Sequence, residues 1–236
     1  MIQTPGVIEG NGTGASGAPR EETTAAVASD GPVPRGEDVS LDAVRALESG
    51  IRFPPYQPYR GSQDLLRASA LVAEHPAVLA ELVRQVVEVE APLHLEQLYD
   101  RVRGLYGHMR AGRRIREALS QAVQQATRRG WVKMEGNFLW RAGQVPTSVK
   151  PRGPGEVARP PEHICPEEWE AAVVEVLRQL GATKKSQVAQ EIVRAVLGHS
   201  RSGLAREYVM QIMERLLAKG ELLELDGVLH VRPQRN

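Results

Sequence analysis

Residues 113–141 read RRIREALSQAVQQATRRGWVKMEGNFLWR, and the spacing of the apolar residues changes within this stretch. Before Gly130 they recur every three or four positions, which is typical of an amphipathic helix. The predicted core stripe of this helix, at about residues 112–129, is Ile115, Leu119, Ala122, Val123 and Ala126. After Gly130 the segments WVKM and FLW flank a turn at residues 135–137, which predicts a β-hairpin.

Two further helices are predicted upstream of this stretch. The first begins at Pro76 and is ended by Pro92, because proline suits the first helical turn but not the interior. Its predicted apolar face is Val78, Leu79, Leu82, Val86 and Val89. The second covers residues 94–107, with Leu95, Leu98, Val102, Leu105 and Tyr106 on one face. Three helices followed by a β-hairpin predict a winged helix.

The same order of elements is predicted again in the second half. Helices are expected at residues 166–180, 185–198 and 204–220, followed by a hairpin around Asp226-Gly227. The two third helices are introduced by related stretches, HMRAGRRIREAL (108–119) and HSRSGLAREYVM (199–210). The predicted fold class is therefore α+β, mainly α with small β-hairpins, in two tandem winged-helix (helix-turn-helix) domains after a disordered N-terminal tail.

The expected boundaries follow from composition. Residues 1–39 are rich in Gly, Ala, Thr, Pro and Glu and are predicted to be a disordered tail. Residues 40–75 are expected to form a short helix at 40–49 and a Pro-rich connector, which contains FPPYQPY. The winged helices are placed at 76–141 and 166–232, joined by a linker at 142–165 with five prolines.

Composition and charge limit the classes of function. The single Cys165 excludes a disulfide framework, and no run approaches the ~20 apolar residues of a membrane span. We expect a cytoplasmic protein with no membrane partner, since no signal peptide is visible either. The whole chain has a net charge of +1, but residues 76–141 carry 11 basic and 7 acidic side chains, net +4. This block is the one that suits a polyanion.

The third helix of the first copy is the predicted contact with DNA, expected to be duplex. In helix-turn-helix proteins this helix enters the major groove, where Arg and Gln suit guanine and adenine edges and Arg also suits phosphate. The predicted DNA-binding residues, including three near the hairpin, are Arg110, Arg113, Arg114, Gln121, Gln124, Arg128, Lys133, Asn137 and Arg141. The alternatives are a solvated charged face, a hairpin that only closes the sheet, and an Arg128 that serves the helix dipole.

Other candidate residues receive different interpretations. Arg116 is expected to form a structural ion pair with a carboxylate of a neighbouring helix. In the second copy, Leu204, Tyr208 and Arg215 are placed on an outward, partly apolar face that suits a protein contact or packing between the copies. The alternative function is accordingly a protein-interaction adaptor.

No catalytic or metal site is predicted. His94 is expected to cap the second helix, and His108 and His199 to stabilise the turns before the third helices through hydrogen bonds. Neither His108 nor His199 has a nearby Cys or carboxylate cluster at metal-ligand spacing, so neither a metal nor another cofactor is expected. The chain also lacks a GxxxxGK[ST] phosphate loop and a nucleophile elbow, so we expect no enzymatic activity.

Three segments of the first copy resemble a known family. Residues 91–94 (APLH), 110–117 (RAGRRIRE) and 138–140 (FLW) are similar to domain-of-unknown-function family 3320. The resemblance is best over about 80–141 and weaker over 166–232. It implies a bacterial domain from the C-terminal region of large proteins that resemble superfamily 1 helicases and often carry a Vsr-like endonuclease domain. It therefore implies a role in helicase- or nuclease-linked DNA processing, with a helicase or nuclease subunit as a further partner.

Overall fold

Two sets of three helices and a β-hairpin follow one another along the chain. The structure, a computed structural model, describes residues 50–61, 71–199 and 201–233, all of which lie in one compact unit spanning residues 39–236. Within these ranges the fold is mixed α and β, with six α-helices and two small antiparallel sheets. The tail predicted for residues 1–39 and the helix predicted at 40–49 lie outside the described residues.

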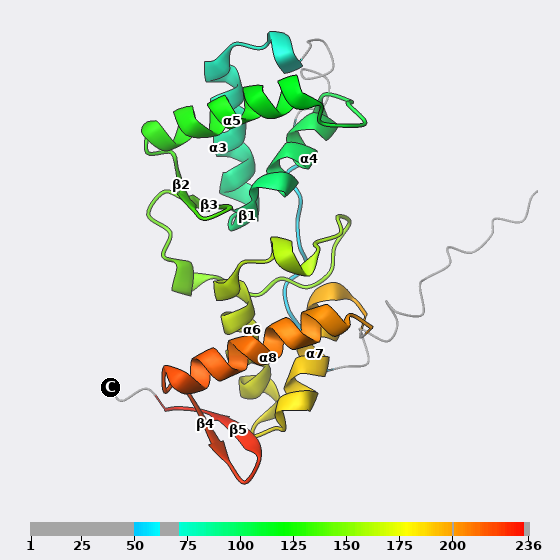
Figure 1. The fold of residues 1–236 in the computed structure, drawn as a ribbon, viewed down its shortest axis with the longest axis vertical. Coiled ribbons are helices and arrows are strands. Elements are labelled where there is room, and N and C mark those ends of the chain that lie inside the picture. The colour runs from blue at the N-terminus through cyan, green and yellow to red at the C-terminus, as the bar shows by residue number, and fades with distance from the viewer. Residues whose placement is uncertain (1–49, 62–70, 200, 234–236) are drawn as a thin grey trace, which may run out of the picture. The chain divides into compact units, whose positions relative to one another are not determined.

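The first half begins with a short 3-10 turn and continues through three helices to a hairpin (Figure 1). Its elements are η1 (Leu71–Ala73), α3 (Pro76–Glu90), β1 (Leu93–His94), α4 (Leu95–Leu105), α5 (Arg113–Arg128), β2 (Val132–Glu135) and β3 (Phe138–Arg141). The stripe predicted for α5 is confirmed, because all five of its members are buried. The face predicted for α3 is partly wrong. Val78 and Val89 are 49% and 45% exposed, while Val83 and Val87 are buried in their place.

The first hairpin belongs to a three-stranded sheet in the order β1-β3-β2. β1 was not predicted, because two residues after a proline carry no periodicity. Its Leu93 lies opposite Leu139 of β3, and its His94 lies opposite Phe138. His94 also caps α4 as expected, since its Nδ1 accepts a hydrogen bond from the amide of Glu96 at 3.2 Å. Burial and the neighbouring His163 lower the pKa of His94, which favours the neutral imidazole that this cap needs.

The second half repeats the order, with element bounds within two residues of the prediction. Its elements are α6 (Pro166–Leu180), α7 (Lys185–Leu197), α8 (Gly203–Ala218), β4 (Leu222–Leu225) and β5 (Val228–Val231). Asp226 and Gly227 have φ of 52° and 75°, the left-handed values that a tight two-residue hairpin requires. A single bridge between Thr183 and Leu229 occupies the place that β1 has in the first half.

The two proline-rich segments lie against each other in extended conformations. Pro55 and Gly153 form a parallel bridge, in which the Gly153 amide donates to Pro54 and the Tyr56 amide donates to Gly153. A Cβ at Gly155 would overlap the carbonyl oxygen of Tyr56, so this crossing requires glycine at position 155. Segment 142–165 also includes two further 3-10 turns, η2 (Pro146–Ser148) and η3 (Pro161–His163). It is more ordered than the linker that its composition predicted.

Two buried glutamates anchor these segments. Glu90 at the end of α3 is fully buried and accepts hydrogen bonds from the Tyr56 hydroxyl, from the Tyr59 amide at 2.8 Å and from Arg101 Nε at 2.6 Å. Burial, reinforced by the charge of Glu90, raises the pKa of Tyr56, so its hydroxyl stays a donor. Glu90 therefore ties the connector to the first half.

Glu168 in the first turn of α6 holds the second segment. Its carboxylate pairs with Arg159 at 2.5 Å and with Arg152 at 3.3 Å, and all three side chains are at most 13% exposed. Arg152 also donates to the carbonyls of Glu90 (2.9 Å) and Pro92. Both guanidinium groups stack on the Tyr56 ring with their carbons 4.8 Å from its centroid. Buried charges of both signs thus join α3, the connector, the linker and α6.

Candidate nucleic-acid interface

The first turn of α5 concentrates positive charge. Gly112 is the N-cap residue and provides no side-chain hydrogen bond, and the first turn holds no acidic residue. It holds instead Arg113, Arg114 and Arg116. The amino end of a helix already carries a partial positive charge, so arginines there are unfavourable for the isolated helix. An anion bound at this turn would relieve that repulsion.

The outward face of α5 continues this basic and amide character along the helix. All six residues predicted on or just before this helix are exposed: Arg110, Arg113, Arg114, Gln121, Gln124 and Arg128. Within the described ranges, the side chains of Arg110, Arg114 and Arg128 form no hydrogen bond or ion pair. Arg113 has only a 3.5 Å pair with Glu117, and both side chains are largely exposed. These cations are free to meet a ligand.

Arg116 lies at the edge of this face and is engaged within the protein. Its Nη1 lies 2.6 Å from Glu96 Oε1 of α4, and its guanidinium carbon lies 5.7 Å from the Tyr99 ring centroid. The hydrogen bond from Arg116 lowers the pKa of Glu96. A shallow depression of about 680 Å³ lies here between α4 and α5, lined by Tyr99, Ala111, Arg113, Arg116, Glu117, Ser120 and Gln121. Arg116 thus orients α5 on α4.

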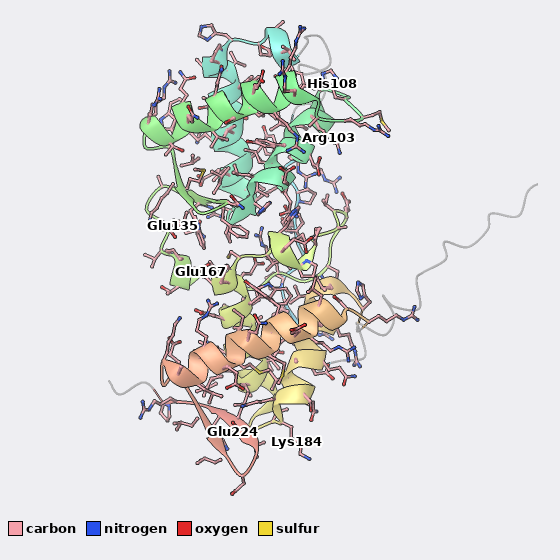
Figure 2. The ribbon with its side chains drawn as sticks, in the orientation of Figure 1. Arg103, His108, Glu135, Glu167, Lys184 and Glu224 are labelled. Atoms are coloured by element: carbon pink, nitrogen blue, oxygen red, sulfur yellow. The ribbon has the colours of Figure 1, made fainter. Side chains whose placement is uncertain are left out.

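Arg103 supports the turn that precedes α5, a role that the sequence analysis missed. Its Nη1 donates to the carbonyls of His108 (3.0 Å) and Met109 (2.6 Å), and its Nε lies 2.7 Å from Asp100. Figure 2 shows Arg103 and His108 side by side at this turn. Imidazole hydrogen bonds expected at His108 and His199 are not made within the described residues. At the first of these turns the Arg103 guanidinium bonds to the carbonyls of His108 and Met109 instead.

Replacing Arg103 with alanine should loosen this turn. Trypsin cleavage after Arg110 is expected to accelerate about thirtyfold, since two hydrogen bonds worth about 1 kcal/mol each are lost. Limited proteolysis followed by mass spectrometry measures this rate. Arg84→Ala is the matched control, because Arg84 forms a similar i,i+3 pair with Glu81 on α3 but no bond to a turn. Equal cleavage rates in the two variants would contradict the role of Arg103.

The hairpin residues differ from the α5 residues in their surroundings. Lys133, Asn137 and Arg141 are exposed, but Lys133 Nζ lies 2.5 Å from Glu135, and the carbonyl of Asn137 accepts a hydrogen bond from the Leu95 amide. One face of β3 is covered, since Trp140 is 1% exposed and packs with Val149 and Cys165. The hairpin thus packs against segment 142–165, and the exposed cations without partners lie mainly on α5.

The corresponding helix in the second half presents another surface. The side chain of Ser202 caps α8, and Leu204 follows it, 67% exposed. Tyr208 was predicted to point outward, but it is half-buried and packs edge-on against Trp169 at 6.2 Å. Trp169 belongs to α6, which lies close enough to α8 to cover the Tyr208 side chain. Arg215 pairs with Glu170 of α6 at 3.5 Å. Of the three predicted protein-contact residues, Leu204 alone is free.

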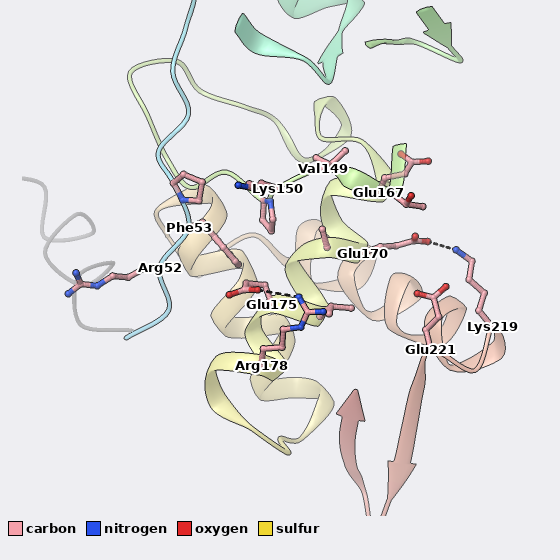
Figure 3. Close-up of a pocket in the computed structure, with 15 residues that line it drawn as sticks. Arg52, Phe53, Val149, Lys150, Glu167, Glu170, Glu175, Arg178, Lys219 and Glu221 are labelled. Carbon is pink, nitrogen blue, oxygen red and sulfur yellow. Dashed lines mark hydrogen bonds and ion pairs between the residues drawn. The ribbon is translucent and has the colours of Figure 1, made fainter. Parts of the chain in front are cut away.

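A second hollow, shown in Figure 3, lies beside α6 and mixes both charges. It measures about 520 Å³ and is lined by Arg52, Lys150, Glu170, Glu175, Arg178 and Lys219, among others. Lys219 pairs with Glu170 at 2.9 Å and Arg178 with Glu175 at 3.8 Å. Within the described ranges, no three His, Cys, Asp or Glu side chains are grouped so as to hold a metal ion. Cys165 is buried, and burial raises the pKa of its thiol.

Comparison with known proteins gives one match. Residues 70–117 match a family described as a protein of unknown function (DUF3320). The matched segment runs from the start of the first half into α5 and includes the APLH and RAGRRIRE stretches. It ends before the hairpin, so it is shorter than the resemblance expected over 80–141 and 166–232. No curated protein and no solved structure gives a significant match. No helix among the described residues is long and apolar enough to cross a membrane.

Proposed function

We propose that this chain is a non-catalytic DNA-binding protein of two tandem winged helices, which contacts duplex DNA mainly through α5. The observation that carries the proposal is the unpaired basic face of α5, with Arg110, Arg114 and Arg128 exposed and without intramolecular partners in the described part of the chain. The uncapped first turn adds the positive end of the helix dipole to the same surface. Gln121 and Gln124 lie beside these cations and suit adenine edges.

The element order and the sheet support the winged-helix assignment. In each half three helices lead into a hairpin, and the chain between the first and second helices pairs with the second strand of that hairpin. The third helix is the one that such domains place in the major groove. The link to helicase- or nuclease-dependent DNA processing in bacteria rests on the family resemblance.

The salt dependence of binding tests the proposal directly. Each phosphate neutralised on duplex DNA contributes a slope of about −0.9 in the plot of log affinity against log salt. The double variant Arg113→Ala/Arg114→Ala should therefore flatten this slope by about 1.8 units if both side chains contact phosphate. Fluorescence anisotropy with a labelled duplex at several salt concentrations measures it.

A matched control uses the second half of the chain. Arg201→Ala/Arg206→Ala removes two exposed arginines at the start of α8 and so changes the net charge equally. This variant should leave the slope unchanged. If both double variants lower affinity alike, net charge alone governs binding and α5 is not the interface. Unchanged affinity of the α5 variant at low salt would refute DNA binding through this helix.

The alternative function, an adaptor that docks a helicase or nuclease subunit, keeps one supporting observation. Leu204 is exposed in the first turn of α8, at the position that Arg114 occupies in α5. Tyr208 and Arg215 no longer support it, since both are engaged within the second half. Leu204→Ser would weaken an adaptor contact and leave DNA affinity unchanged.

A further inference from the structure

The two β-hairpins can be compared residue by residue, because both have four-residue strands joined by two-residue turns. In the first hairpin Lys133 lies opposite Trp140 and Glu135 opposite Phe138. In the second hairpin Leu223 lies opposite His230 and Leu225 opposite Val228. Leu223 and Leu225 therefore occupy the positions of Lys133 and Glu135. At both positions a charged side chain of the first half is replaced by leucine.

This difference falls on the free edge of a sheet. β4 pairs only with β5 among the described residues, and the antiparallel register directs the backbone groups of Leu222 and Glu224 away from β5. Free edges are usually protected by charged side chains, which discourage another strand from pairing. Lys133 and Glu135 provide that protection on β2, where they form a 2.5 Å ion pair. β4 instead exposes Leu223 (36%) and Leu225 (57%).

The first hairpin also shows what can cover this kind of face. Its Trp140 is buried under Val149 and Cys165, two small apolar side chains that follow η2 and precede α6, each with extended backbone dihedral angles. At the second hairpin the same face carries Leu225, Val228 and His230, and Leu225 stays more than half exposed. Small apolar side chains on extended backbone can therefore cover the outer face of such a hairpin.

The charges around β4 define the occupant further. Residues 221–226 carry three carboxylates and no basic side chain. Glu224 shares Lys185 with Glu214, whereas Glu221 and Asp226 have no cationic partner in the described part of the chain. A second copy of this chain would add three more carboxylates along the same edge. A basic segment would neutralise them.

We propose that β4 is a docking edge for an extended, basic segment of a partner protein, which adds to the β4–β5 sheet as a further strand. Backbone hydrogen bonds to Leu222 and Glu224 would hold the segment, as in other complexes formed by strand addition. Its small apolar side chains would cover Leu223 and Leu225. Its alternate Lys or Arg side chains would lie on the opposite face with Glu224, between the carboxylates of Glu221 and Asp226 at the two ends of β4. This surface is separate from the basic face of α5 and does not depend on DNA binding.

The test uses the full chain and a labelled peptide of alternating Lys and Val. Fluorescence anisotropy should detect saturable binding of this peptide, and the variant Leu223→Lys/Leu225→Glu should weaken it by about tenfold or more. This variant transfers the protective pair of the first hairpin to the second. Both leucines are exposed, so the thermal unfolding midpoint should stay close to that of the parent chain. The reciprocal variant Lys133→Leu/Glu135→Leu should leave affinity unchanged or raise it.

Two control peptides separate strand addition from simple charge attraction. A peptide of alternating Lys and Pro has the same charge but lacks alternate backbone N–H groups, and it should bind about tenfold more weakly. A peptide of alternating Glu and Val should not bind. Equal affinity for the Lys-Val and Lys-Pro peptides, or binding unaffected by Leu223→Lys/Leu225→Glu, would overturn the proposal. A dimer in sedimentation that this variant abolishes, without peptide binding, would overturn it in favour of self-pairing.

Discussion

Replacement of Glu168 with alanine is expected to lower the free energy of unfolding by about 3–5 kcal/mol, because it leaves buried positive charge without a counterion. Arg159 and Arg152 both direct guanidinium nitrogens at this carboxylate, and their side chains are only 5% and 13% exposed. Two further nitrogens of Arg159 are buried without a hydrogen-bond partner, so its stacking on the Tyr56 ring is the main interaction left to compensate its charge. Chemical denaturation followed by circular dichroism measures the loss.

Glu167 provides the control for this experiment. It lies in the same first turn of α6 and has the same favourable interaction with the helix dipole. It is less buried and forms no ion pair with a basic side chain in the described part of the chain. Glu167→Ala should therefore cost about 1 kcal/mol or less. A Glu168→Ala/Arg159→Leu double variant should regain part of the stability lost in Glu168→Ala. The second substitution removes the buried Arg159 charge that the first leaves without a counterion. Equal losses in the two single variants would show that burial of the pair is unimportant.

Replacement of Trp140 with alanine should cost about 3–5 kcal/mol, the range for emptying a buried aromatic site. Trp140 is 1% exposed and fills the space between β3, Val149 and Cys165. Its Nε1 is buried without a hydrogen-bond partner, so Trp140→Phe should cost much less than the alanine variant. The stability lost in Trp140→Phe reports the change in side-chain volume alone. Denaturant unfolding of the parent chain and the two variants measures the order of their free energies of unfolding.

His230 is the matched position on the second hairpin. It lies opposite Leu223, as Trp140 lies opposite Lys133. His230 is only partly buried, and we expect His230→Ala to change stability by about 0.5 kcal/mol or less. A large loss in His230→Ala would contradict the view that the outer face of the second hairpin is uncovered. A small loss in Trp140→Ala would contradict the packing of segment 142–165 on the first hairpin.

Local patterns were sufficient to predict the helices and hairpins. The core stripe of α5 and its exposed Arg and Gln residues follow from a period of 3.6, because one apolar face fixes the direction of every other side chain. Asp226-Gly227 marked its hairpin because few residues adopt left-handed φ easily. In α3 the pattern was less informative. Valines lie all around this helix, so hydrophobicity could not show that Val78 and Val89 fall outside the buried stripe.

Local patterns could not predict the contacts between distant segments. Tyr56, Glu90, Arg152 and Glu168 are separated by up to 112 positions, and none of them belongs to a periodic motif that names its partner. Their association depends on where four segments meet, and burial then makes each charge require an opposite one. The exposed edge of β4 is of the same kind. Leu223 and Leu225 look like core residues in the sequence, and only the register with β5 shows them on the outer face.

The sequence by itself thus determined the order and bounds of the six described helices and the two hairpins, and the basic face of α5. These depend on the spacing of neighbouring residues, and neighbours in a helix or strand have a known geometry. The tertiary structure alone decided which charges are buried together, that Arg103 supports the turn before α5, and which sheet edge is unprotected. Each of these depends on which backbone segments pack together, and the spacing of neighbouring residues does not determine that.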